Sequence, residues 1–190
     1  MTKHRHFIIH KPYNFLSQFV LETNRKVQLL GELYDFPKGT MAIGRLDKTT
    51  EGLLFLTTDG KMSERVRAKH IEKEYYAQVD GVIDEAAIEQ MKKGVEIGIR
   101  DVKYMTKPCK ANRLIPPPEF PPRIVKIRDE RHGPTSWVSI TLTEGKFKQV
   151  RKMTAAVGFP TLRLFRVRIH NIWLEDLEAG AVLEVDNFGV

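Results

Sequence analysis

Short apolar runs separated by polar or turn-forming residues recur along the chain, and this pattern favours strands over long helices. In the stretch EYYAQVDG the alternation is strict, because Tyr75, Ala77 and Val79 share one face and the residues between them share the other. We therefore expect a half-buried strand here. By similar reasoning, strands are expected at residues 7–9, 41–46, 53–57, 123–129, 136–145, 161–170 and 182–188, and an extended segment at 103–114.

A few segments carry helical signals instead. Asp84 is a suitable N-cap for a helix with Ala87, Ile88 and Met91 on one face, and Gly94 would end it. A second helix is expected at 149–157, a short third helix at 62–69, and a short helix or part of a loop at 27–34. Many strands with few helices predict an α+β fold whose mixed, mostly antiparallel sheet is flanked by helices.

The main break in the pattern is the proline-rich stretch Ile115–Pro122. Proline removes backbone donors and favours extended, stiff backbone. We interpret the stretch as an exposed connection between two halves, but it is too short to indicate two independent domains. Residues 1–190 are therefore expected to form a single domain.

The charge of the chain is unevenly distributed. The net charge is +7 and the pI about 9.5, which favours polyanionic partners, above all nucleic acid. From Gly145 to Leu174 there is no Asp or Glu, and the stretch carries Lys146, Lys148, Arg151, Lys152, Arg163, Arg166 and Arg168. Such a run is compatible with an ordinary solvated face, but its one-sidedness favours a phosphate-binding surface. Within 161–170 we expect Arg166, Arg168 and His170 on the exposed side of a strand.

Several classes of protein are disfavoured by what the sequence lacks. The single Cys109 cannot form an intrachain disulfide, and the histidines show no metal-ligand spacing. No apolar run is long enough to span a bilayer, and the N-terminus lacks the apolar core of a signal peptide. Common hydrolase, nucleotide-binding and dinucleotide-binding motifs are missing. We therefore expect a cytoplasmic protein without a metal site, a redox cofactor or a membrane partner.

Asp47 is the most informative single residue. It lies between Arg45 and Lys48, next to a strand, where a structural salt bridge with either neighbour is the ordinary explanation. A strand end is also where catalytic groups are mounted on a rigid scaffold, and Thr49 or Thr50 could bond the loop or the carboxylate. An ionised, positioned Asp can act as a nucleophile or stabilise a cationic transition state.

Four sequence motifs carry a resemblance to a known family. The stretches are HKPYNFLSQF, GRLDKTTEGLL, KEYYAQVDG and EGKFKQVRKMTAAVGFPTLRLFRVRI, in this order. They resemble the motifs of the ribosomal small-subunit/large-subunit pseudouridine synthases, and most closely those of the E-type large-subunit subgroup. Two positions depart from the usual pattern, since Lys148 replaces an arginine and Asn14 replaces a glycine. Asn tolerates left-handed backbone, so the turn at Asn14 can be kept.

The resemblance implies a fold and a set of site residues. It implies two lobes with a central cleft, in one catalytic domain without an S4-type RNA-binding domain. It assigns the essential aspartate to Asp47, its paired arginine to Arg151 and the active-site tyrosine to Tyr75, a residue whose pattern alone favours a core position. Residues expected to contact RNA are Arg45, Lys73, Lys146, Lys148, Gln149, Lys152, Arg166 and Arg168.

The implied reaction converts a uridine of large-subunit ribosomal RNA to pseudouridine, near the peptidyl-transferase region. It needs neither metal nor cofactor, because the glycosidic bond is broken and remade as a carbon–carbon bond without redox change. The expected partner is that RNA or an assembly intermediate, bound by a monomer. Two other classes of function remain open, namely a non-catalytic RNA-binding protein and a nucleoside or nucleic-acid hydrolase that uses Asp47.

Overall fold

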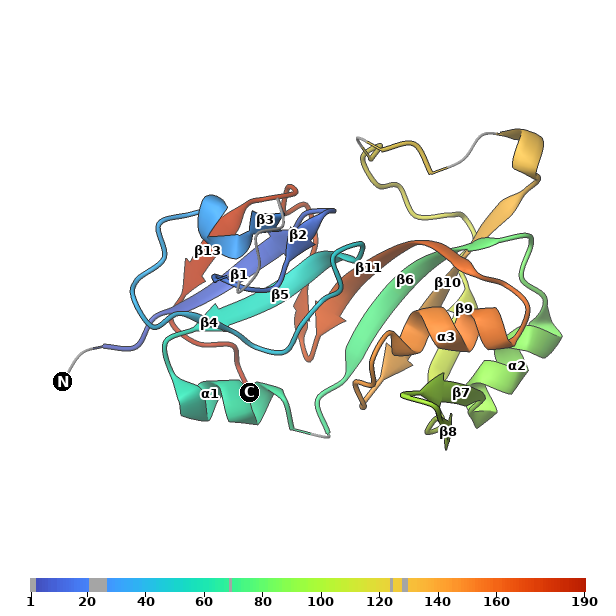
Figure 1. Cartoon of the computed structure of the whole chain (residues 1–190), viewed down its shortest axis with the longest axis horizontal. Helices are drawn as coiled ribbons and strands as arrows, with labels where there is room; N and C mark the ends of the chain where they lie inside the picture. The colour runs from blue at the N-terminus through green and yellow to red at the C-terminus, as the bar shows by residue number, and fades with distance from the viewer. Residues whose placement is uncertain (1–2, 21–26, 69, 124, 128–129) are drawn as a thin grey trace. The chain divides into compact units, whose positions relative to one another are not determined.

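The computed structural model describes residues 3–20, 27–68, 70–123, 125–127 and 130–190. The chain divides into two compact units (Figure 1). Unit 1 contains residues 1–71 and 165–190, and unit 2 contains residues 72–164. Strand β11 (Thr161–Ile169) contributes its first four residues to unit 2 and the remainder to unit 1.

Unit 1 is built on a sheet whose strands run in the order β13, β1, β5, β11. Its elements are β1 (His6–Lys11), β2 (Phe15–Leu16), β3 (Gln28–Leu29), the 3₁₀ helix η1 (Leu30–Glu32), β4 (Met41–Ala42), β5 (Glu51–Thr57), α1 (Gly60–Val66), β12 (Ile172–Trp173) and β13 (Val182–Val185). Every residue of β1 and β5 is buried, and each strand has an uninterrupted apolar centre, residues 7–9 in β1 and 53–56 in β5. The β1–β5 and β1–β13 pairs are antiparallel, whereas β5 and β11 are parallel.

Gly52 makes the close approach of β5 and β11 possible. It pairs with Arg166 and has a φ of +104°. A Cβ at this position would overlap the carbonyl oxygen of Arg166 and lie 2.8 Å from its amide nitrogen. The glycine that follows Asp47 by five positions therefore has a steric function in the sheet.

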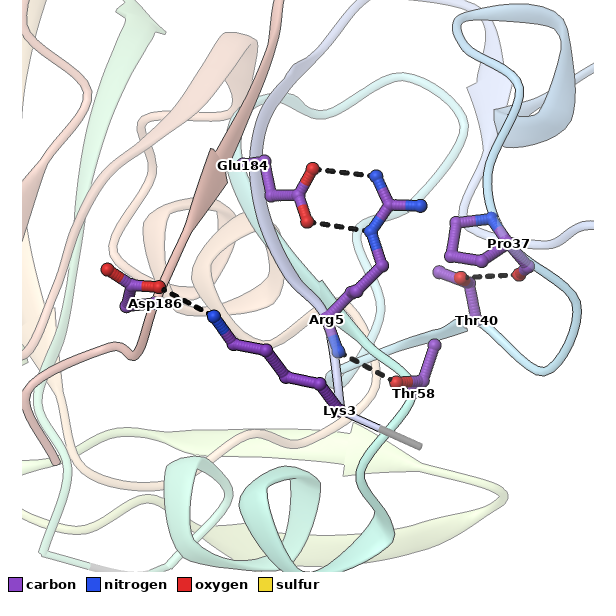
Figure 2. Close-up of polar contacts among 7 residues, drawn as sticks. All are labelled: Lys3, Arg5, Pro37, Thr40, Thr58, Glu184 and Asp186. Atoms are coloured by element: carbon purple, nitrogen blue, oxygen red, sulfur yellow. Dashed lines mark hydrogen bonds and ion pairs between the residues drawn. The ribbon is translucent and has the colours of Figure 1, made fainter. Parts of the chain in front are cut away.

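Charged side chains join the segment before β1 to β13 and the residue after it, as drawn in Figure 2. The guanidinium of Arg5 donates from Nε and Nη2 to the two carboxylate oxygens of Glu184, at 2.7 and 2.6 Å. This pairing lowers the pKa of Glu184 and raises that of Arg5. Both side chains are well exposed, so the fork fixes geometry more than it adds stability.

Unit 2 places two helices against an antiparallel sheet in the order β6, β10, β9. Its elements are β6 (Lys73–Asp80), α2 (Glu85–Lys93), β7 (Glu96–Ile99), β8 (Val102–Met105), β9 (Lys110–Arg113), η2 (Glu130–His132), β10 (Thr135–Leu142) and α3 (Gln149–Ala156). One apolar cluster joins them, with Ala77 of β6, Met91 of α2 and Met153 of α3 all fully buried. Strands β7 and β8 form a separate hairpin.

The predicted fold class is confirmed, because the protein has a mixed, mostly antiparallel sheet and few helices. The helix at 85–93 is also confirmed, with Asp84 Oδ1 accepting from Ala87 N at 2.8 Å and Gly94 following its last turn. The segment at 27–34 is a two-residue strand followed by a 3₁₀ turn, and the strand expected at 41–46 extends only over Met41–Ala42.

The strand predicted at 123–129 is wrong for Arg123 and residues 125–127, which are irregular; residues 124, 128 and 129 lie outside the described part. The two apolar residues of this stretch that the structure describes, Val125 and Ile127, belong to no strand. The preceding proline-rich stretch is held instead by Phe120, whose ring packs against Tyr76 and Trp137.

Candidate functional site

Asp47 lies in an irregular loop between β4 and β5, residues 43–50, called the Asp47 loop below. The hydroxyl of Ser17 accepts from Leu46 N at 3.0 Å and donates to Leu46 O at 2.9 Å. On the other side of Asp47, the backbone amide of Asn14 donates to Lys48 O at 2.9 Å. The loop is thus held at two points by the segment that follows β1, which fixes the backbone on either side of the half-buried Asp47.

The carboxylate of Asp47 is not held by its basic neighbours. Within the described part of the chain, neither Arg45 nor Lys48 forms an ion pair with it. The structural salt bridge considered from the sequence is therefore not formed. Thr50 N donates to Asp47 O at 3.0 Å and closes the turn, whereas the buried hydroxyl of Thr50 has no partner among the described residues.

Lys11, at the end of β1, is a buried cation in the same unit. Its side chain is fully buried, and Nζ donates to the carbonyl oxygens of Pro12 and Phe15, both at 2.8 Å. Burial lowers the pKa of Lys11 from 10.5 to about 7, while the negative charges of Glu51 and Asp47 act in the opposite direction. Lys11 was not among the predicted site residues, although HKPYNF was recognised as a motif.

Arg166 does not lie where the alternation in β11 placed it. Its side chain is 3% exposed, and Nε donates to Leu53 O at 2.8 Å, while Nη2 has no partner among the described residues. The expectation of an exposed Arg166 is therefore wrong. Strand β11 is buried on both faces around this position, since residues 163–167 are all buried. A buried guanidinium beside Leu53 O supports the sheet rather than presenting its charge to solvent.

Tyr75 lies on β6 in unit 2, paired with Ile140 of β10. Its side chain is partly exposed and packs against the apolar cluster of this unit. The face that it shares with Ala77 and Val79 is the one predicted, and those two residues are fully buried. Tyr75 therefore lies at the margin of the core, a position that allows a ring to be both supported and accessible.

Arg151 lies on α3 and is half-buried. Its Nη1 donates to Thr161 O at 3.3 Å, at the start of β11. The hydroxyl of Thr154 donates to Arg151 O and is hydrogen-bonded to the hydroxyl of Thr161 at 2.7 Å. These contacts join the helix to the strand and restrict the orientation of the guanidinium.

Residues 143–148 form the second irregular loop of interest, called the lysine loop below, between β10 and α3. Glu144 Oε2 accepts from Tyr104 OH at 2.7 Å, and Glu144 Oε1 accepts from Gln149 Nε2 at 2.6 Å. Burial would raise the pKa of Glu144, but hydrogen bonds from Tyr104, Lys107 N and Gln149 outweigh it and lower the pKa. The carboxylate is thus an ionised anchor beneath an otherwise basic loop.

Gln149 has a different role from the one expected. Its side chain is buried, and Oε1 accepts from the backbone amide of Lys146 at 2.9 Å. Because Oε1 bonds Lys146 N and Nε2 bonds Glu144, the side-chain amide of Gln149 stabilises the loop. We therefore revise its predicted role from RNA contact to loop support.

The remaining predicted residues are divided between the two units. Unit 1 contains the exposed Arg45 and also Arg168, whose Nη1 donates to His170 O and whose guanidinium lies 5.3 Å from the ring centroid of Trp173. Unit 2 contains the exposed Lys146 and Lys148 and the half-buried Lys73 and Lys152. Within unit 2, the structure brings Lys146, Lys148 and Lys152 together around the lysine loop.

Two further observations concern cofactors and membranes. Among the described residues, no group of three or more His, Cys, Asp or Glu side chains is arranged to hold a metal ion. In the same part of the chain, no helix combines the length and the apolar character needed to cross a membrane.

Comparison with known proteins finds the same family that the four motifs resemble. A family model described as RNA pseudouridylate synthase matches residues 5–156. A ribosomal large subunit pseudouridine synthase E of Vibrio parahaemolyticus is 40% identical over 182 residues, which cover 94% of this chain and 72% of that protein. The protein of the same name from Xanthomonas axonopodis is 37% identical over 172 residues, covering 90% and 88%. A crystal structure of a pseudouridylate synthase has a TM-score of 0.75 and 27% identity, covering 97% of this chain and 71% of that one.

Proposed function

Because this chain belongs to the RNA pseudouridylate synthase family, we propose that it converts one uridine of large-subunit ribosomal RNA to pseudouridine, near the peptidyl-transferase region. The names of its most similar relatives support the large-subunit substrate. The family match covers parts of both units, which supports treating them as two lobes of one catalytic domain. We further propose that the enzyme works as a monomer in the cytoplasm, on the RNA itself or on an assembling subunit.

The observation that carries the proposal is that Asp47 has a fixed backbone and a carboxylate without an ion pair to its basic neighbours. Its backbone is fixed on both sides through Ser17 and Asn14, while its carboxylate is not used by Arg45 or Lys48. A carboxylate that is positioned but not consumed by a structural ion pair is available to a substrate. Cleavage of a glycosidic bond develops positive charge on the sugar, which an ionised carboxylate can stabilise or capture.

The proposed roles of the other residues are those that the motif resemblance implies. We assign to Arg151 the binding and orientation of the Asp47 carboxylate in the catalytic complex, since a guanidinium binds a carboxylate with two parallel donors. Tyr75 packs against the base or assists removal of the C5 proton. A target uridine must leave its stack to reach these groups, and the exposed Arg45 is suited to fill the space that it vacates.

RNA affinity is assigned mainly to Lys146, Lys148, Lys152, Lys73 and Arg168. Ammonium and guanidinium groups near the surface neutralise phosphates and release counterions. The buried Arg166 is assigned to the support of β11, so its substitution is expected to affect folding before binding.

The decisive experiment is single-turnover conversion of uridine with enzyme in excess. Asp47→Asn keeps the shape of the side chain but removes its charge, and should abolish conversion while leaving the fold and most of the RNA affinity intact. Asp35→Asn, at an exposed aspartate of the same unit, is the matched control. Conversion by a folded Asp47→Asn enzyme at the wild-type rate would refute the proposal, and release of free uracil would indicate a hydrolase instead.

Two additional measurements refine the assignment. Arg151→Lys keeps the charge but loses the two-pronged geometry, so conversion should be strongly impaired rather than unchanged. Pseudouridine mapping across ribosomal RNA, with and without the gene, identifies the target. If all large-subunit sites persist and a tRNA or small-subunit site is lost, the large-subunit assignment is wrong.

A further inference from the structure

Phe147, at the tip of the lysine loop, is the most unusual exposed residue of unit 2. Its side chain is 61% exposed, although a phenyl ring gains about 2 kcal/mol or more from burial in a protein core. Single exposed apolar residues are common and need no explanation by themselves. Phe147 differs from them in having two cations beside it, because the ammonium groups of Lys148 and Lys152 each lie 5.2 Å from its ring centroid.

The loop presents this ring on a preorganised backbone. Gln149 holds the amide of Lys146 through its side chain, and Gln149 N donates to Lys146 O at 3.1 Å. Glu144 in turn is held by Tyr104 and Gln149. Because these bonds lie on both sides of the tip, Phe147 and its neighbours are held before any partner arrives. Preorganisation reduces the entropy lost on binding, which suits a recognition surface.

The charge around Phe147 indicates the chemistry of its partner. The ring lies in the segment 145–174, which contains no acidic residue, and Lys146 adds a third cation packed on the ring of Tyr104 at 4.5 Å. An apolar peptide segment would gain nothing from the ammonium groups of Lys148 and Lys152 beside the ring. A nucleotide uses both features, since its base has a face that stacks on an aromatic ring and its phosphates pair with cations.

We propose that Phe147 is a stacking platform for an unpaired base of the substrate RNA, and that Lys148 and Lys152 hold the phosphates beside that base. The identity of the RNA rests on the proposed function, whereas the stacking contact itself does not. Because the proposed function assigns the target uridine to Asp47 and Tyr75, we assign the platform to a different nucleotide of the same RNA. The ring is tolerant of base identity, because every base has a π-face.

Stacking and charge neutralisation can be separated by salt dependence. The equilibrium constant for binding a single-stranded RNA of about twelve nucleotides is measured over a range of salt concentrations. Phe147→Ala should weaken binding about tenfold without changing the slope of log K against log salt, because no counterion release is lost. Lys148→Asn should reduce that slope by about 0.7. Asparagine is chosen because Lys148 has a φ of 52°, which asparagine tolerates.

Two companion variants make the result specific. Phe147→Trp, which keeps a larger stacking face, should bind at least as tightly as the wild type. Met105→Ala removes an apolar side chain of the same unit that is 62% exposed, and should leave affinity unchanged. Melting curves check that all variants are folded, which is expected because Phe147 contributes little to the core.

Several outcomes would overturn the proposal. They are wild-type affinity of Phe147→Ala, a loss in Phe147→Trp equal to that in Phe147→Ala, or a change of salt slope in Phe147→Ala like that in Lys148→Asn. Failure of the proposed function has a different signature. In that case the wild-type protein converts no uridine in single turnover, while the binding measurements on Phe147 still decide whether the ring stacks on RNA.

Discussion

The Asp47 loop and the lysine loop are both irregular segments between regular elements, yet they are held in different ways. The Asp47 loop depends on remote partners, since Ser17 is 29 positions away from Leu46 and Asn14 belongs to the segment after β1. The lysine loop combines local and remote contacts: Gln149 bonds Lys146 N and Glu144 within a few positions, and Glu144 also accepts from Tyr104 and from Lys107 N. The backbone beside Asp47 therefore depends on the segment after β1, whereas the backbone at Lys146 is held by a neighbour three positions away.

The largest effect on the Asp47 loop is expected from Gly52→Ala. The new methyl group would overlap the backbone of Arg166, and the φ of +104° is unfavourable for alanine. We expect a loss of about 3 kcal/mol or more in the free energy of unfolding, with activity lost in parallel. Urea denaturation measures it. Gly98→Ala in the β7–β8 hairpin, where a Cβ meets nothing within 4 Å, should be far milder. Equal effects of the two substitutions would contradict the close approach of β5 and β11.

Lys11 predicts a dependence of stability on pH that belongs to unit 1. Its pKa is lowered to about 7 in the folded protein from 10.5, so between these values the unfolded chain binds the proton and the folded chain does not. The free energy of unfolding should therefore rise with pH from about 7 towards 10.5. Below pH 7 Lys11 is protonated in both states, and the free energy that it costs to bury this charge is fully present.

The measurement compares wild type with Lys11→Met, which cannot titrate. The difference in unfolding free energy between the two should change by about 2 kcal/mol from pH 7 to pH 9, in favour of the wild type at higher pH. Parallel pH profiles for the two proteins would show that Lys11 titrates alike in the folded and unfolded states.

Ser17→Ala tests the remote anchoring directly. The substitution leaves both the amide and the carbonyl of Leu46 without the hydroxyl that bonds them in a buried place, which costs about 1–3 kcal/mol. Because Leu46 adjoins Asp47, conversion of uridine should also slow in protein that remains folded. Ser63→Ala removes another buried hydroxyl of the same unit outside the loop and serves as the control. A Ser17→Ala enzyme with wild-type stability and rate would show that the loop holds its own shape.

The contrast between the loops also explains which features were predictable from the sequence. Strand β6 and helix α2 were predictable because their signals are local: strict alternation around Ala77 in one case, and a cap at Asp84 with a terminal Gly94 in the other. Arg166 was misplaced because alternation identifies two faces of a strand but not which of them solvent reaches. The sheet partner β5, which decides this, is more than a hundred residues away.

The site residues also differ in how far their roles depend on distant partners. Asp47 and Arg151 were identified by motif resemblance, which requires no knowledge of their partners. Ser17 was missed because its importance arises only when the segment after β1 folds against the Asp47 loop. Lys11 was missed because its burial and its bonds to two carbonyl groups exist only in the folded chain. A polar residue between apolar ones, as in FLSQF, carries no signal of the backbone group that it will bond.

The smallest expected effect tests the local anchoring of the lysine loop. Gln149→Ala removes the acceptor for Lys146 N and the donor to Glu144, both within a few positions of the substitution. We expect a loss of about 1 kcal/mol in the free energy of unfolding. RNA affinity should fall a few-fold through the looser loop, with the salt slope unchanged because every cation is kept. Gln90→Ala, at an exposed position on α2, is the matched control. If Gln149→Ala had wild-type stability and affinity, the lysine loop would not depend on its flanks, and the distinction between the two loops would be lost.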